Sequence, residues 1–250
     1  NSYSQGTDPR VLAMLDKGLP SMHAFLAKMP EEARKTFLLA HPNDVKMSEA
    51  LNYRFPPLAE QLNLGVRGLE IDLNADPEGG AYADPAAYRL LRQQGVTDLL
   101  PFDPAPLAAP GLKVLHMPDI DFRSSCPSLR ACLQQVKAWS DANPDHVPLF
   151  IMLEAKVQSA ALLPGATTPP PFTPAIYDEI DRTIVDVVGR DRLITPDDVR
   201  GKHKRLEDAV LAGNWPTLAK SRGKMLFMLI TATGNDGASE YLEGHPGLRG

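Results

Sequence analysis

Long apolar runs, basic clusters and nucleotide-binding loops are all missing from this 250-residue chain. A helix that crosses a bilayer needs about 20 consecutive apolar residues, and no such run is present. The formal net charge is −5, and no stretch is rich in lysine or arginine, so a nucleic-acid partner is not expected. No glycine-rich phosphate loop of either common type occurs, which leaves a nucleotide-binding fold without support. The composition is that of an ordinary globular protein, 43% hydrophobic and 23% charged.

Cysteine is also scarce, since Cys126 and Cys132 are the only two. With Pro127 between them, they fit either two thiols in the core or one bridge from a loop to a helix. No signal peptide is visible, but Asn1 is not a natural first residue, so we expect that an upstream segment has been removed. The length suits one large domain of the size of an α/β barrel.

Two acidic residues lie within an otherwise apolar stretch, residues 65–73. In a strand, Glu70 and Asp72 occupy one side, and the other side holds Leu69, Ile71 and Leu73. Positions two apart on a strand are separated by about 6.5–7 Å, so both carboxylates can reach one cation. A divalent metal would relieve both their repulsion and the cost of burying them. The alternative is an exposed strand end whose acids pair with Arg67 or a lysine.

Apolar segments with strand character alternate with segments of helical spacing along the chain. We expect strands at residues 65–73, 111–116, 148–156, 192–195 and 224–230. We expect helices within residues 9–29, 56–64, 85–94, 128–143, 175–188 and 215–221, and a further helical region from Thr195 or Asp197. This alternation favours a parallel sheet covered by helices. Because an eight-stranded barrel needs further strands at both ends, the fold is either an incomplete barrel or an open, doubly wound sheet.

Three of the expected strands end in residues that are capable of chemistry. Glu70 and Asp72 end the first, His116 ends the second, and Glu154 with Lys156 ends the third. The carboxyl ends of parallel strands form the usual rim of an active site in such folds. Three carboxylates suit calcium or magnesium, whereas zinc prefers more nitrogen or sulfur ligands. We therefore expect His116 to act as an acid or a base.

Each of these residues, taken alone, also has a purely structural explanation. His116 could be a satisfied histidine at a strand end, and Glu154 could pair with Lys156. Asp119 and Asp121 could cap the following turn, with only a weak chance of contacting a substrate. The joint arrangement favours a functional site, because independent accidents would have to place suitable groups at three consecutive strand ends.

Four motifs together resemble one known family. They are Asn-Ser-Tyr at residues 1–3, Gly-Leu-Glu-Ile-Asp-Leu at 68–73, Val-Leu-His-Met-Pro-Asp-Ile-Asp at 114–121 and Phe-Ile-Met-Leu-Glu-Ala-Lys at 150–156. The set is similar to the calcium-dependent phosphoinositide-specific phospholipase C family of bacteria and fungi. That family is related to the catalytic barrel of eukaryotic phospholipases C and, more distantly, to glycerophosphodiester phosphodiesterases.

The resemblance implies a TIM-type (β/α) barrel, with residues 1–250 as a single domain that is truncated at both ends. By analogy, the calcium ligands would be Asn1, Glu70, Asp72 and Glu154. His116 would be the second catalytic histidine, and Lys156 a weaker candidate for binding a phosphate or a carboxylate. The first motif of the family is His-Asn-Ser-Tyr, so its histidine would precede Asn1, and we expect this chain to be nearly inactive.

The resemblance also implies a location and a disulfide. Members of the family are commonly exported, so we expect a secreted or periplasmic protein, and this favours a bridge between Cys126 and Cys132.

The implied reaction is cleavage of phosphatidylinositol-type lipids into diacylglycerol and inositol phosphate. The inositol 2-hydroxyl would attack the phosphorus, Glu70 would be a possible base, and His116 would protonate the leaving oxygen. Calcium is the expected cofactor, with Mg²⁺ as the alternative. We expect a monomer that contacts membrane surfaces transiently and binds no nucleic acid. The alternatives are a glycerophosphodiester phosphodiesterase and a non-catalytic protein that binds lipid head groups or sugars with calcium.

Overall fold

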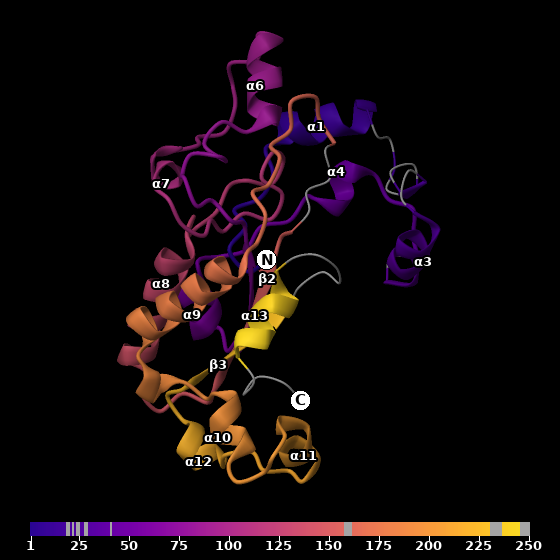
Figure 1. Cartoon of the computed structure of the whole chain (residues 1–250). Helices are drawn as coiled ribbons and strands as arrows, with labels where there is room; N and C mark the ends of the chain where they lie inside the picture. Colours follow the sequence, from indigo (N-terminus) through magenta and orange to yellow (C-terminus); the bar gives the residue numbers. More distant parts are fainter. Residues whose placement is uncertain are drawn as a thin grey trace.

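A computed structural model describes residues 1–18, 21, 23, 26–27, 30–40, 42–157, 162–230 and 237–245. At its centre lies a sheet of three parallel strands in the order β1-β2-β3 (Figure 1). These strands are β1 (Gly68–Leu73), β2 (Leu149–Ala155) and β3 (Met225–Ile230). Helices connect each strand to the next, which confirms the expected α/β fold with a parallel sheet.

The helices fall into four groups along the chain. Before β1 lie α1 (Pro9–Gly18), α3 (Glu31–Ala40), α4 (Met47–Ala50) and α5 (Leu58–Asn63). Between β1 and β2 lie α6 (Ala86–Gln93), α7 (Ala105–Ala108) and α8 (Leu129–Ala142). Between β2 and β3 lie α9 (Pro174–Val188), the short 3₁₀ turn η1 (Arg190–Arg192), α10 (Pro196–Arg200), α11 (Leu206–Leu211) and α12 (Leu218–Ser221). After β3 comes α13 (Ala238–Gly244). No described helix is long and apolar enough to span a bilayer.

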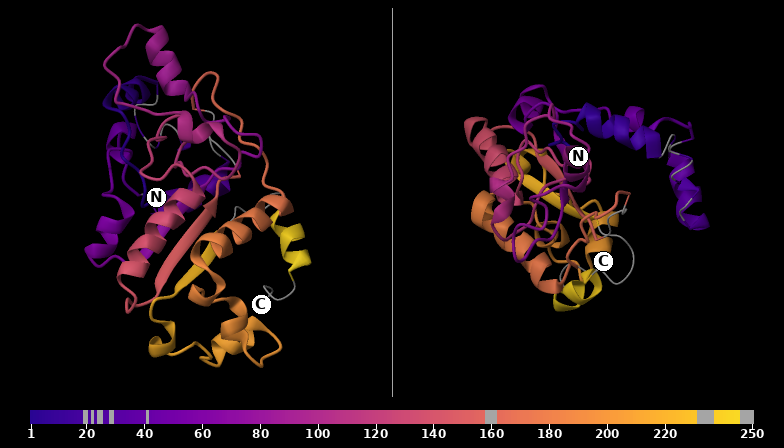
Figure 2. Two further views of the ribbon diagram at one scale, coloured as in Figure 1. Left: turned by 90° about the vertical axis from the view of Figure 1, so that its left-hand side faces the viewer. Right: turned by 90° about the horizontal axis from the view of Figure 1, so that it is seen from above.

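Helices α8 and α9 pack side by side along the sheet (Figure 2). Helix α8 begins where Ser128 Oγ accepts a hydrogen bond from Ala131 N, a favourable N-cap. The largest buried apolar cluster joins the inward side chains of β1 and β2 to the apolar stripes of these helices. It includes Ile71, Leu133, Val136, Ile151, Leu153 and Ile180. A second cluster, between α1, α4 and α6, lies beyond the carboxyl end of the sheet (Figure 1).

The N-terminal segment runs beside the free edge of β1. Ser2 N donates to Glu70 O at 2.9 Å, and Glu70 N donates to Ser2 Oγ at 3.0 Å. The strand bonds to β2 through other residues, since Phe150 N donates to Arg67 O and Lys156 N donates to Leu73 O. Residues 1–4 therefore lie on the opposite side of β1 from β2, and Asn1 comes to rest beside Glu70.

Two of the five expected strands are wrong. Residues 111–116 make only isolated antiparallel bridges, from Lys113 to Asn74 and to Ser128, because the segment crosses the end of β1 instead of running along it. Residues 192–195 make one parallel bridge, between Leu193 and Met225, and helix α10 begins at Pro196 directly afterwards. Proline has no N–H with which to continue a ladder. The described residues thus contain three strands, and the full barrel is not seen.

Cys126 and Cys132 form a disulfide with an S–S distance of 2.09 Å. It joins the segment before α8 to the first turn of that helix. Both half-cystines belong to the main buried cluster and are almost inaccessible to solvent.

Two adjacent glycines at the loop after β1 differ in the space around them. Both have positive φ angles, +84° at Gly79 and +79° at Gly80. A Cβ at Gly79 would lie 2.4 Å from the carbonyl oxygen of Ala108, whereas a Cβ at Gly80 would meet nothing within 4 Å. Of these two glycines, only Gly79 therefore lies where a side chain would clash with neighbouring backbone.

Gly79→Ala should destabilise the protein more than Gly80→Ala. Gly80→Ala is expected to lower the free energy of unfolding by about 1–2 kcal/mol, because positive φ strains an L-residue. Gly79→Ala adds a backbone clash and should cost about 1–3 kcal/mol more. Urea unfolding of the two variants measures the difference, and equal losses would contradict the close approach at Gly79.

Candidate active site

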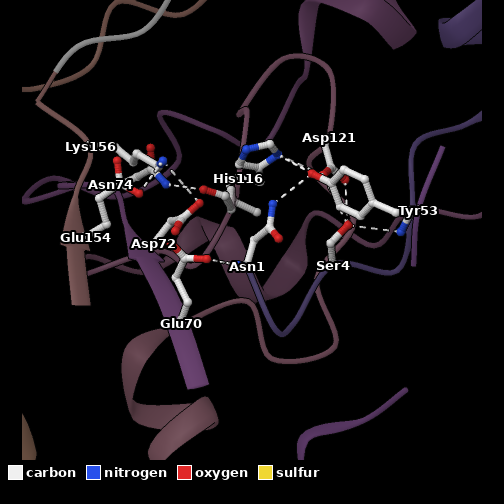
Figure 3. Close-up of polar contacts among 12 residues, drawn as sticks. Asn1, Ser4, Tyr53, Glu70, Asp72, Asn74, His116, Asp121, Glu154 and Lys156 are labelled. Carbon is white, nitrogen blue, oxygen red and sulfur yellow. Dashed lines mark hydrogen bonds and ion pairs between the residues drawn. The ribbon is translucent and has the colours of Figure 1, made fainter. Parts of the chain in front are cut away.

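Three carboxylates meet at the carboxyl ends of β1 and β2. Glu70 and Asp72 come from β1, and Glu154 comes from β2, where the parallel register pairs it directly with Asp72. One oxygen from each lies within 4.8 Å of the others (Figure 3). The structure therefore brings together the three acids that the sequence singled out, in an arrangement that can surround one cation.

The Asp72 carboxylate is buried with few partners. The residue is 1% exposed, and neither oxygen meets hydrogen-bond geometry with a described residue. Burial raises its pKa, although the ammonium of Lys156, 3.3 Å from Oδ2, and the Tyr3 hydroxyl both oppose this rise. A buried carboxylate with few partners is costly. A hard cation bound by Asp72, Glu70 and Glu154 would relieve that cost, so the residues present fit calcium.

Lys156 bridges two of the acids. Its Nζ lies 2.9 Å from Glu154 Oε2 as well as 3.3 Å from Asp72 Oδ2. Burial lowers its pKa, but the two carboxylates outweigh this effect and the pKa is raised. Lys156 therefore carries its charge at neutral pH. Of the two roles considered from the sequence, the structure shows the contact with carboxylates.

Asn1 lies beside the acids through its backbone. Its backbone nitrogen is 2.6 Å from Glu70 Oε2, and its side-chain Nδ2 donates to Tyr53 OH at 2.7 Å. One Glu70 oxygen also lies within 4.8 Å of oxygens of Asp72 and Glu154. Glu70 can therefore ligate a cation together with them or accept a proton.

The His116 imidazole is oriented by a buried carboxylate. Nδ1 lies 3.0 Å from Asp121 Oδ2 and 2.6 Å from Tyr53 OH (Figure 3). Because a carboxylate only accepts hydrogen bonds, Nδ1 carries a proton, and Nε2 is left for chemistry. Burial and the charge of Asp121 raise the pKa of Tyr53, so the phenol keeps its proton and donates to Asp121. Ser4 Oγ donates to the same carboxylate at 2.9 Å.

Asp121 and Tyr53 are the residues whose role sequence reasoning missed. The sequence predicts that Asp121 caps a turn. A turn is present here, since Met117 N donates to Asp121 O at 3.2 Å. Its side chain, however, is fully buried against His116. The spacing of five residues across a turn after His116 was the available signal. Tyr53 precedes the site by a long stretch of chain, and nothing local marks it.

Asp119 has a structural role in this arrangement. It accepts hydrogen bonds from Ala86 N, at the start of α6, and from Thr167 N, at 2.8 and 2.7 Å. It therefore fastens the segment before α9 to the start of α6.

Asn74 connects the acidic cluster to His116. Its backbone exchanges two hydrogen bonds with Lys113, each of 2.9 Å, and its Nδ2 donates to Leu115 O at 2.7 Å. The residue just before His116 is thereby tied to the end of β1. The electrostatic influence of His116 reaches both Glu70 and Asp72, which places the imidazole near the acids.

Comparison with known proteins gives one family and a set of solved structures. Residues 22–250 match the family described as "Phosphoinositide phospholipase C, Ca2+-dependent". A solved calcium-dependent phosphoinositol-specific phospholipase C from Pseudomonas sp. is 22% identical, with 77% of this chain and 57% of that chain covered and a TM-score of 0.49. A calcium-dependent phosphatidylinositol-specific phospholipase C from Streptomyces antibioticus is 24% identical, with 74% and 53% covered and a TM-score of 0.48. The chain thus spans just over half the length of these structures. No curated protein matches.

Asp72→Asn is expected to abolish stabilisation by calcium without harming the metal-free fold. In the presence of a chelator, the free energy of unfolding should stay close to that of the parent, because the amide removes a buried charge from a cluster of three acids while Lys156 keeps Glu154 as its partner. With calcium at about 100 times its Kd, the parent should gain about 2.7 kcal/mol. The variant should gain almost nothing. Denaturant unfolding with and without calcium measures both effects.

Asp186→Asn is the control. Asp186 is an exposed acid near the end of α9 that pairs with Arg130 of α8 and does not belong to the acidic cluster. This variant should keep the full gain from calcium. An equal calcium gain in Asp72→Asn and the parent would refute the ligand assignment.

Proposed function

The chain belongs to the Ca²⁺-dependent phosphoinositide phospholipase C family, and from that premise we propose that the acidic cluster and His116 cleave a phosphodiester in a phosphatidylinositol-type lipid. The observation that carries the proposal is the buried, incompletely paired carboxylate of Asp72 beside two further acids, close to an oriented imidazole. We also propose that the three parallel strands form part of a TIM-type barrel, since each crossover is helical and the polar residues lie at the carboxyl ends.

Glu70, Asp72 and Glu154 would hold the calcium, with Asn1 as a further ligand and Mg²⁺ as the alternative ion. When bound, calcium supplies electrostatic stabilisation of the charge that develops on the phosphoryl oxygens. Glu70 would accept the proton of the attacking hydroxyl, a role for which its carboxylate lies beside Asp72 and Glu154.

His116 is the proposed general acid. The inositol 2-hydroxyl oxygen forms a bond to phosphorus as the bond to the diacylglycerol oxygen breaks, and His116 Nε2–H gives its proton to that leaving oxygen. Asp121 accepts the Nδ1–H bond and thereby stabilises the charged imidazolium before transfer. The products of this step are diacylglycerol and a cyclic inositol phosphate, because phosphorus keeps its original bond to inositol. Attack of water on that phosphorus, with release of the 2-oxygen and return of a proton to it, then gives inositol phosphate.

The function is tested with full-length protein on phosphatidylinositol vesicles. Inositol phosphate should be released with calcium and not with chelator, and His116→Ala should lower kcat by about 10²–10⁴-fold, because the leaving oxygen loses its proton donor. Calcium affinity should stay unchanged in that variant. His203→Ala, on a surface loop outside the site, is the control and should keep the parent rate.

Other outcomes distinguish the alternatives. Calcium-dependent cleavage of glycerophosphodiesters alone would identify a glycerophosphodiester phosphodiesterase. Calcium binding without turnover on either substrate would identify a head-group binding protein. An unchanged rate in His116→Ala would remove the residue from the mechanism.

Asp121→Asn tests the positioning of the imidazole. The amide keeps an acceptor but loses the negative charge, so kcat should fall by about 10²–10³-fold while KM stays within about twofold. Steady-state kinetics together with the melting temperature check this split. A loss that appears in KM, or that follows the melting temperature, would indicate a purely structural role for Asp121.

A further inference from the structure

Lys156 occupies the space between two carboxylates that the proposed metal must contact. Its Nζ is within ion-pair distance of Asp72 Oδ2 and Glu154 Oε2, at 3.3 and 2.9 Å. The dashed contacts in Figure 3 show the ammonium reaching both acids from the end of β2. A cation bound by the same oxygens would meet this ammonium, and the two positive charges repel each other.

We propose that Lys156 is an internal counter-ion that competes with calcium for Asp72 and Glu154 and that, once displaced, binds the phosphate of the substrate. This inference rests on the proposed function, because it concerns the same metal site. Lys156 then lowers the calcium affinity of the free protein and contacts phosphate in the calcium-loaded protein.

The charges of the cluster support the competition. Glu70, Asp72 and Glu154 bring three negative charges together, and Lys156 neutralises only one of them. A divalent ion neutralises two and can be ligated by all three acids, so it is the better partner. Repulsion between the calcium ion and the ammonium weakens the Lys156 contacts even where the metal takes the other oxygen of each carboxylate, so the two cations compete for the cluster.

The side chain of Lys156 is free to move while its backbone is fixed. Lys156 N donates to Leu73 O at 2.8 Å, which extends the pairing of β1 and β2 by one residue. The side chain is 20% exposed, so part of it borders solvent. Four rotatable bonds allow the ammonium to swing without shifting the strand. A released ammonium next to the metal is a point charge suited to a phosphate oxygen.

The competing explanation is a structural ion pair that only fastens β1 to β2. The two explanations predict opposite effects on calcium binding. Removing a competitor makes calcium bind more tightly, whereas removing a structural support leaves the affinity unchanged or weakens it.

Lys156→Met in the full chain separates them. The methionine keeps an unbranched side chain of similar length and removes the charge. Isothermal titration with calcium alone, without substrate, should show a Kd lower by about tenfold. Lys137→Met is the matched control, because Lys137 pairs with Asp141 on the surface of α8 at 2.6 Å, and its calcium Kd should equal the parent value. Lys156→Gln, which stays polar, should lie between the parent and Lys156→Met, and it provides the test if the methionine variant does not fold.

The phosphate contact is measured on calcium-saturated protein with inorganic phosphate as the probe, below the concentration at which calcium phosphate precipitates. Phosphate should bind Lys156→Met about fivefold more weakly than the parent, as expected for one lost charge-assisted contact. An unchanged or higher calcium Kd in Lys156→Met overturns the competition, and an unchanged phosphate affinity overturns the substrate contact. If the parent itself binds no calcium, the metal assignment and the proposed function fail instead, and that result is distinct from both.

Discussion

The buried negative charge of Asp72, only partly balanced by its neighbours, is the constraint on which the rest of the site depends. The parallel register puts Glu154 directly beside it on the neighbouring strand, and Glu70 lies two residues before it on the same side. Like charges this close destabilise one another, and burial adds to the cost. The surrounding protein compensates only in part, through the ammonium of Lys156. The remaining imbalance is what makes the cluster a cation site and not an ordinary set of ion pairs.

A rigid frame joins this charge to the imidazole. Asn74 follows the acids on β1 and bonds to the segment that ends at His116. Beneath it, Lys113 and Asp76 form an ion pair of 3.5 Å with both side chains 2% exposed. On the other side, Ser4 holds Asp121 and thereby the Nδ1 side of the ring. The acids and the imidazole thus belong to one hydrogen-bonded unit, which suits chemistry that needs fixed geometry.

Local patterns predicted the acids but not the groups that support them. The alternation in residues 68–73 gave the strand and its two carboxylates, because side-chain direction on a strand follows the sequence alone. The same reasoning failed at residues 111–116, where an apolar run crosses the sheet end, since pairing depends on what lies alongside. The contacts of His116 with Tyr53 and of Lys156 with Asp72 join segments that only the tertiary fold brings together. The family motif located His116 in the sequence, but it did not reveal which group orients the ring.

The buried charge at position 72 costs stability in the metal-free protein, because Lys156 compensates its lost hydration only in part. Stability of this kind is commonly lost at functional sites, where strained or unpaired groups are held by a scaffold that is stable elsewhere. Here the scaffold is the apolar packing of β1 and β2 against α8 and α9, which includes Ile71 at 0% exposure directly next to Asp72. That packing fixes the backbone on both sides of the charge, so the carboxylate cannot turn to solvent to recover its hydration. The desolvation cost that remains at Asp72 after folding therefore favours the binding of a cation. The rigid core beneath the site holds the carboxylate in place and so supports this affinity.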